Sequence, residues 1–124
     1  MFSRDLKRGV YHYNVRDNYL EYMWEFSLEE VKEIFVNQAF ILNSSVIFFI
    51  TADMKRGISK YGERYLRFVF LEAGHLSQNF IVLSTNLKLK TCPIGGFVEE
   101  KVMNILDIRK FELELPIYAI AIGK

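Results

Sequence analysis

A long apolar helix pattern that runs into a Pro-Ile-Gly-Gly turn is the feature that most constrains how this chain can fold. Between about Glu63 and Leu87, apolar residues recur at intervals of three and four: Tyr65, Val69, Ala73, Leu76, Phe80, Leu83 and Leu87. This spacing predicts a helix facing a core, roughly 37 Å long. Because other faces of the helix are apolar too, we expect it to be central to its domain.

Polar residues within this helix exclude a membrane span. Glu72, His75, Gln78 and Asn79 interrupt the apolar run well before the roughly 20 residues that a transmembrane helix requires. Buried polar side chains need hydrogen-bond partners. We therefore interpret His75 as a core histidine with satisfied hydrogen bonds rather than as a catalyst.

Strand and helix patterns alternate along the rest of the chain. A β-hairpin is expected over residues 9–24, helices over residues 28–39 and 98–106, and strands buried on both faces over residues 46–50 and 117–122. Ser27 and Glu30 have the spacing of a capping box at the start of the first helix. The 124 residues thus predict one α+β domain, with a mixed or antiparallel sheet packed on a long central helix.

Charge and cysteine content narrow the class of protein. The chain has 16 Lys and Arg against 15 Asp and Glu, so it has no excess of positive charge that would favour the binding of nucleic acid. The single cysteine, Cys92, cannot form an internal disulfide, which fits a reducing compartment. The first residues contain no apolar signal core, so we expect a cytoplasmic protein. Histidine and cysteine spacings predict no metal site.

Two short segments carry residues suited to chemistry. Lys60 and Tyr61 are adjacent, so on a regular helix they point about 100° apart and can share a site only at a helix start or in irregular backbone. A lysine removed from water can act as a base. The alternative is that Lys60 is solvated and Tyr61 only packs.

The second segment is the turn formed by Pro93, Ile94, Gly95 and Gly96. Glycines let backbone N–H groups approach a planar ligand closely, and the start of a following helix favours negative charge. The alternative is a simple turn without a ligand.

Five segments, in order, resemble the C-terminal half of a SagB-type dehydrogenase, from the FMN-dependent azoline oxidase branch of the nitroreductase superfamily. They are residues 9–13 (GVYHY), 60–62 (KYG), 71–79 (LEAGHLSQN), 93–97 (PIGGF) and 116–124 (PIYAIAIGK). The resemblance implies a partial nitroreductase-like fold over residues 1–124.

The resemblance also implies roles for particular residues. Lys60 and Tyr61 match a catalytic pair, and the turn at residues 93–96 matches one that lies against the isoalloxazine ring of FMN. Lys124 matches a basic residue that contacts the flavin phosphate. The arginine- and serine-bearing motif that grips this phosphate in the first half of the family domain has no match here, so we expect a truncated domain.

This departure leaves two hypotheses open. The first is an FMN-dependent oxidoreductase that acts as a homodimer, with the long helix in or beside the interface, or with a partner subunit that supplies the missing N-terminal half. Its chemistry would be the oxidation of azoline rings in a peptide. The second is a non-catalytic remnant, or one subunit of a split enzyme, that serves as a binding or structural module without flavin.

Overall fold

One strand, β5 (Glu114–Gly123), organises the computed structural model, which describes residues 6–109 and 112–124. It lies between β3 (Val46–Asp53) and β4 (Lys90–Ile94), and both neighbours run antiparallel to it. Residues 119–122 of β5 are fully buried. The predicted doubly buried strand near the C-terminal end of the sequence is therefore confirmed.

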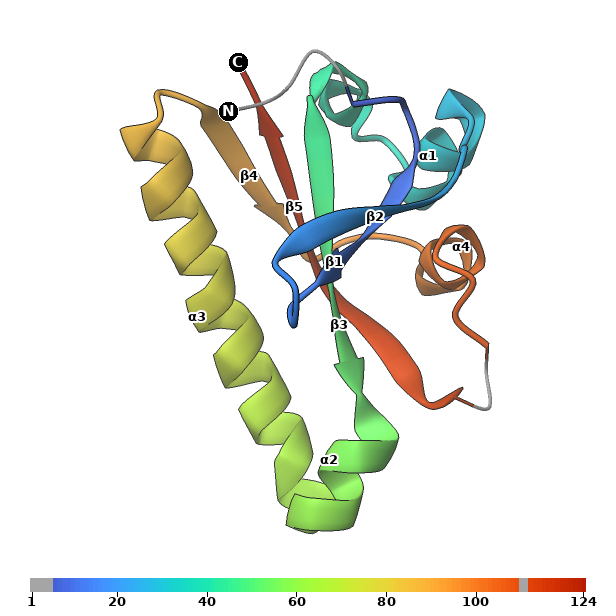
Figure 1. Ribbon diagram of the computed structural model, residues 1–124, viewed down its shortest axis with the longest axis vertical. Helices are drawn as coiled ribbons and strands as arrows, with labels where there is room; N and C mark the ends of the chain where they lie inside the picture. Colours follow the sequence, from blue (N-terminus) through green and yellow to red (C-terminus); the bar gives the residue numbers. More distant parts are fainter. Residues whose placement is uncertain (1–5, 110–111) are drawn as a thin grey trace.

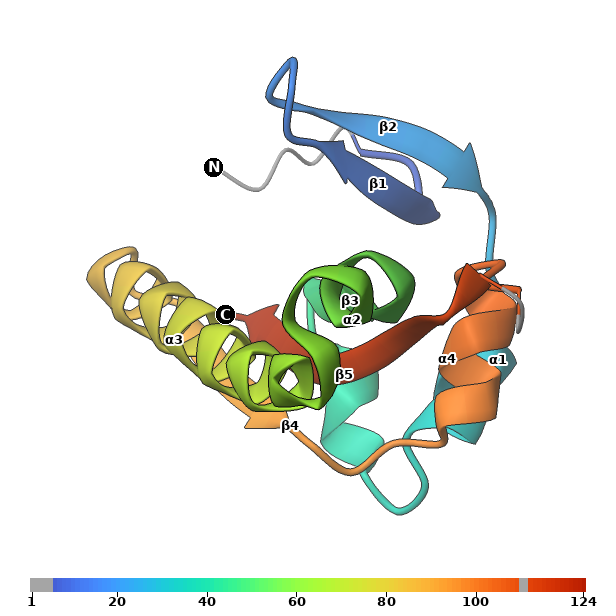
Figure 2. The ribbon, with the colours of Figure 1, turned by 90° about the horizontal axis from the view of Figure 1, so that it is seen from below.

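Helices cover both faces of this sheet (Figures 1 and 2). On one face, α1 (Leu28–Ile34) and α4 (Glu99–Ile105) pack with Ala119 and Ala121 in the main hydrophobic core. Side chains alternate between faces along a strand, so Ile120 and Ile122 point to the other face, which α3 covers. The predicted α+β fold, with an antiparallel sheet packed on the long helix, is confirmed.

Small side chains bring α3 (Tyr65–Asn86) onto the sheet. Its buried residues are Val69, Ala73, Ser77 and Ser84. The predicted helix is present, but the predicted stripe is wrong in its second half, because Leu76, Leu83 and Leu87 are 45%, 63% and 65% exposed. The face with small residues permits a closer approach to the strands than a row of leucines would.

Two further predictions of burial are wrong. His75 lies on the exposed side of α3 and is not a core histidine. Strand β3 is half-buried rather than covered on both faces, because it stands at the edge of the sheet in the described part of the chain. An apolar run of this length does not distinguish an edge strand from a central one.

The helices near the ends of the sheet are shorter than predicted. The capping box of Ser27 and Glu30 is confirmed, but α1 ends at Ile34, and a 3-10 helix, η1 (Ala39–Asn43), follows after a residue with positive φ, Asn37. The chain between α3 and β4 is short, since α3 ends at Asn86 and β4 begins at Lys90.

Strand β4 includes Pro93, and a proline is tolerated there because β4 is the other edge strand of the sheet. The predicted helix after the turn is confirmed as α4.

The predicted hairpin forms a separate two-stranded sheet. Its strands are β1 (Val10–Asn14) and β2 (Tyr19–Trp24), and Figure 2 shows them apart from the three-stranded sheet, on the side of β3. The Trp24 indole N–H donates a 3.0 Å hydrogen bond to the carbonyl of Ile105 in α4. This bond ties the base of the hairpin to the main core. No helix in the described ranges is long and apolar enough to cross a bilayer.

The contact between α3 and the sheet generates the first prediction. The Ser77 hydroxyl is buried and has no hydrogen-bond partner among the described residues. Ser77→Ala should raise the free energy of unfolding by about 1 kcal/mol, because an unsatisfied buried polar group is removed. Ser77→Leu should lower it by about 1–3 kcal/mol through overpacking. Urea denaturation measures both changes, with Gln78→Ala and Gln78→Leu as controls on the exposed neighbour. A stabilising Ser77→Leu would contradict the close approach.

Candidate functional site

The turn after β4 is exposed and has room for a ligand. Ile94 is buried and pairs with Ala119, whereas Gly95 and Gly96 are exposed. A Cβ atom on Gly95 would meet only the Tyr118 ring, at 3.7 Å, which is an ordinary contact. Neither glycine of the turn has positive φ. The fold itself therefore does not require these glycines, and their effect is to leave the backbone accessible.

Few hydrogen bonds hold this turn. The Val98 N–H donates to the Ile34 carbonyl at 3.0 Å, and the Gln38 Nε2 group donates to the Gly96 carbonyl at 2.8 Å. Within the described ranges the N–H groups of Gly95 and Gly96 have no partner. Exposed and unpaired N–H donors on bare backbone suit the acceptor atoms of a planar heterocycle.

The start of α4 does not add a positive field to this turn. Its first turn carries Glu99 and Glu100, and the helix has only seven residues. Carboxylates at a helix N-terminus offset the helix dipole. The prediction that this helix end favours a negative ligand charge is therefore not supported.

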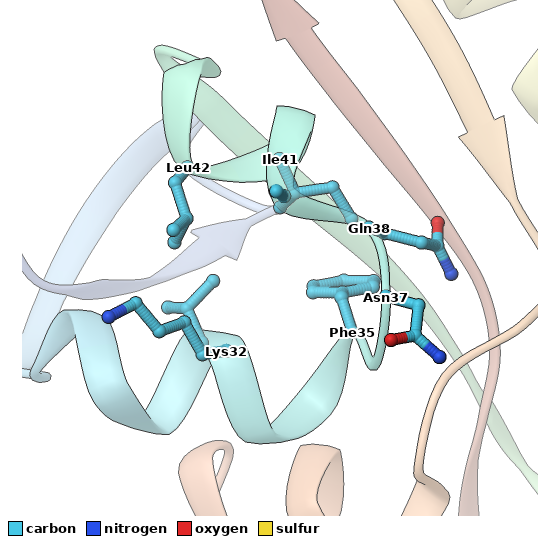
Figure 3. A pocket seen from close by; sticks show the side chains of 8 residues that line it. Lys32, Phe35, Asn37, Gln38, Ile41 and Leu42 are labelled. Atoms are coloured by element: carbon cyan, nitrogen blue, oxygen red, sulfur yellow. The ribbon is translucent and has the colours of Figure 1, made fainter.

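A half-open apolar cavity of about 220 Å³ lies between α1 and η1 (Figure 3). Phe35 and Ile41 contribute its apolar wall, while Lys32 and Leu42 lie at one end and Gln38 at the other. None of the predicted site residues lines it.

Lys60 and Tyr61 meet at the end of α2 (Met54–Tyr61) rather than at a helix start. The Lys60 Nζ atom lies 4.9 Å from the centre of the Tyr61 ring, which is a cation–π contact. Gly62 follows with φ of 60°, which ends the helix. The Tyr61 ring also stacks on Tyr65 and meets Phe68 edge-on. The pair is thus brought together, but Lys60 is exposed, so the described residues do not remove it from water.

The structure does not bring the three predicted parts of the site into contact. Lys124 follows β5 directly, where Gly123 pairs with Lys90 at the start of β4. The turn lies at the other end of β4, about 14 Å away for a strand of this length. In Figure 1, α2 and the C-terminal residue lie at opposite ends of the molecule. Further protein surface is needed to close a site around these groups.

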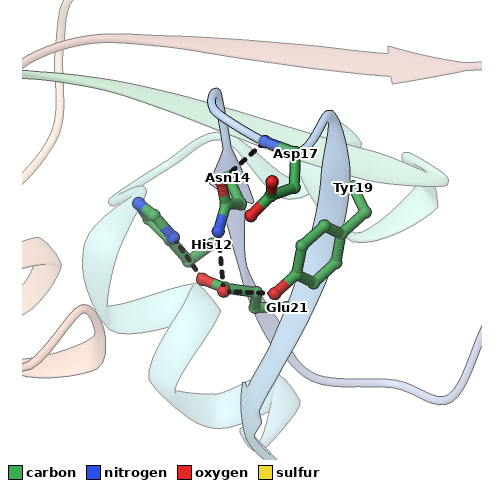
Figure 4. Close-up of polar contacts among 5 residues, drawn as sticks. All are labelled: His12, Asn14, Asp17, Tyr19 and Glu21. Carbon is green, nitrogen blue, oxygen red and sulfur yellow. Dashed lines mark hydrogen bonds and ion pairs between the residues drawn. The ribbon is translucent and has the colours of Figure 1, made fainter.

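The hairpin carries a polar cluster that the sequence reasoning missed (Figure 4). Glu21 accepts hydrogen bonds from Asn14 Nδ2 at 3.0 Å, the Tyr19 hydroxyl at 2.8 Å and His12 Nδ1 at 2.7 Å. The bonds from Asn14, then His12 and Tyr19, lower the pKa of Glu21 to about 2. The signal was the alternation of polar residues 12, 14, 19 and 21 along two paired strands. The cluster joins β1 to β2.

In the part of the chain that the structure describes, no group of three or more potential metal ligands gathers.

Comparison with known proteins places these features in one family. Residues 6–124 match the nitroreductase family. The chain is 31% identical over 111 residues to a candidate nitroreductase of Methanocaldococcus jannaschii, a match that covers 89% of this chain and 56% of the relative. The chain belongs to the nitroreductase family. Members of this family usually bind a flavin and are often dimers.

Solved structures agree with the fold. A crystal structure of a candidate nitroreductase from Anabaena variabilis superposes with a TM-score of 0.89 at 28% identity, over 98% of this chain and 25% of that one. A chain of the E. coli microcin synthetase McbBCD complex, with truncated pro-MccB17 bound, has a TM-score of 0.73 at 16% identity, over 92% of this chain and 43% of that one. This second likeness shows the fold alone. The chain spans about half the length of the archaeal relative.

The Glu21 cluster generates the second prediction. A carboxylate whose pKa is lowered by native hydrogen bonds stabilises the fold above its unfolded pKa, and the contribution is lost as the pH falls toward the folded pKa. Glu21 should therefore titrate near pH 2, in contrast to an ordinary glutamate near 4.3. NMR titration of the side-chain carboxyl carbons measures this midpoint. Asn14→Ala should raise it, whereas Lys55→Ala should not; a midpoint above 4 in the unmutated chain would contradict the cluster.

Proposed function

We propose that this chain forms part of an FMN-dependent oxidoreductase of the SagB type and contributes the turn that contacts the flavin ring. The observation that carries the proposal is the exposed turn at Gly95 and Gly96. Among the described residues its two N–H groups have no partner, and added Cβ atoms would meet only the Tyr118 ring at 3.7 Å and the Gln38 side chain at 3.8 Å, both ordinary contacts. Membership of the nitroreductase family supports flavin as the ligand.

The residues present fit one side of FMN. The turn offers N–H donors to the ring, and Lys124, an exposed cation about 14 Å along β4, offers a charge to the phosphate. Bound FMN would supply the acceptor for a hydride. The remaining contacts to the phosphate would come from protein surface outside these residues, which agrees with the match to only 56% of the archaeal relative.

Within this proposal, Lys60 and Tyr61 handle protons. Conversion of an azoline to an azole removes a hydride from carbon and a proton from a neighbouring atom, so a base near the reacting ring is required. The Lys60 Nζ atom is the candidate base and needs a partner surface to remove it from water; the Tyr61 ring, 4.9 Å away, positions the protonated form of the side chain. The peptide substrate is part of the proposal and follows from the resemblance to the azoline oxidases; the likeness to the McbBCD complex supports the fold alone.

A partner surface is part of the proposal because Lys60 is exposed and the site is open. The outer side of α3 exposes Leu76, Leu83 and Leu87, and β3 has no strand on its outer edge among the described residues. A long apolar edge strand and an apolar helix side favour association. We propose that a second copy packs against α3 and that the other half of the family domain, on the same or another polypeptide, covers β3.

The third prediction tests the turn. Gly95→Val should abolish FMN binding, because a branched side chain would occupy the space in which the ring approaches the backbone. Fluorescence quenching of FMN during titration with purified protein measures affinity, and Asp17→Val, in the exposed hairpin turn, is the matched control. Unchanged affinity in Gly95→Val would remove the turn from the site. An unmutated protein that takes up no FMN would favour the alternative, a binding module without flavin.

The fourth prediction tests the proton-handling pair. Lys60→Ala should lower turnover of an azoline-containing peptide by roughly 10²–10⁴-fold, the usual range for a positioned acid–base group. The assay requires the assembled enzyme, and flavin content should stay the same. Lys55→Ala changes an exposed lysine on the same helix and should leave turnover unaffected. Full activity in Lys60→Ala would end the catalytic interpretation.

A further inference from the structure

Two consecutive glycines make the turn after β4 intrinsically mobile. Glycine has no Cβ to restrict its backbone torsions and loses the most conformational freedom on ordering. Gly95 and Gly96 lie between two fixed points, the pairing of Ile94 with Ala119 and the 3.0 Å bond from the Val98 N–H to the Ile34 carbonyl. A site that depends on backbone donors needs a further restraint between these points.

Gln38 provides that restraint. Its Nε2 group donates to the Gly96 carbonyl at 2.8 Å across 58 positions of sequence, and within the described residues it is the only side chain that forms a hydrogen bond with Gly95 or Gly96. The carbonyl of Gly96 and the N–H of Phe97 belong to one rigid peptide plane. The bond therefore fixes the direction of the Phe97 N–H as well.

The backbone of Gln38 is itself held firmly. Its N–H donates to the Phe35 carbonyl at 3.2 Å, and its carbonyl accepts from the Ile41 N–H at 3.0 Å. The Phe35 ring packs edge-on against the ring of Phe97, with their centres 6.5 Å apart. The segment between α1 and η1 thus holds the turn by one hydrogen bond and one aromatic contact. The Gln38 side chain leaves this rigid segment beside the apolar cavity (Figure 3).

We infer that Gln38 is a positioning residue that fixes the peptide group between Gly96 and Phe97, and with it the Phe97 N–H donor, for a flavin ring, an inference that rests on the proposed function. It acts through the Gly96 peptide group and does not itself belong to the predicted contacts with the ring. Gln38 lies within residues 28–39, which the sequence predicts to be helical, but α1 ends at Ile34. The structural feature that indicates this role is a donor side chain held opposite a pair of glycines.

The test uses the isolated chain labelled with ¹⁵N. Gln38→Met keeps the length of the side chain and removes its donor, so the amide signals of Gly96 and Phe97 should move. FMN affinity, measured by titration, should fall roughly 2- to 10-fold, the effect of one neutral hydrogen bond. The urea midpoint should match that of Gln78→Met, a control on the exposed side of α3.

Gln38→Glu provides a signature that a packing role would not produce. At pH 7 its carboxylate faces the Gly96 carbonyl and cannot donate, whereas below about pH 4 the protonated acid donates again. The Gly96 and Phe97 signals should therefore return toward their unmutated positions as the pH falls. Unmoved signals in Gln38→Met, or signals in Gln38→Glu that do not respond to pH, would overturn the inference. Absence of FMN binding to the unmutated chain would instead overturn the proposed function, and with it only the flavin part of the inference.

Discussion

The pairing of β5 with a strand on each edge is the interaction on which the rest of the structure depends. Residues 119–122 are buried because β3 and β4 close both edges while α1, α4 and α3 cover both faces. Small residues at Ala119 and Ala121 let α1 and α4 approach one face. Ala73 and Ser77 let α3 approach the other. Any change that widens these contacts would also move the end of β4, where the candidate site begins.

The candidate site follows from where β4 ends. Strand pairing places Ile94 opposite Ala119, and the chain must then leave the sheet toward α4 through two glycines. The residues at and after the end of α1 contact this segment: Ile34 and Gln38 by hydrogen bonds, and Phe35 by a ring contact. The backbone donors of the turn are thus presented by rigid elements on both sides. The same architecture leaves Lys60 and the outer side of α3 uncovered, which is why the proposed activity needs further protein surface.

Local sequence signals predicted most of the elements, whereas burial depended on the sheet. Three features depend on residues that are neighbours in the sequence, and all three are confirmed. They are the capping box at Ser27, the hairpin and the apolar run that forms the buried strand β5. The exposure of Leu83 and His75 depends on which side of α3 meets a narrow sheet, and periodicity alone does not determine this. Within the candidate site, residue types identified the turn, but the bond from Gln38 joins segments 58 positions apart and required the fold.

The central claim is that the turn after β4 is a flavin-contact surface. Titration of FMN into the ¹⁵N-labelled chain tests it most directly, because NMR detects even a weak complex of an open site. The account predicts saturable shifts at the amides of Gly95, Gly96 and Phe97 and at Lys124, with Asn18 in the hairpin turn unmoved. Saturable shifts confined to other residues, or no site-specific shift at millimolar FMN, would contradict it.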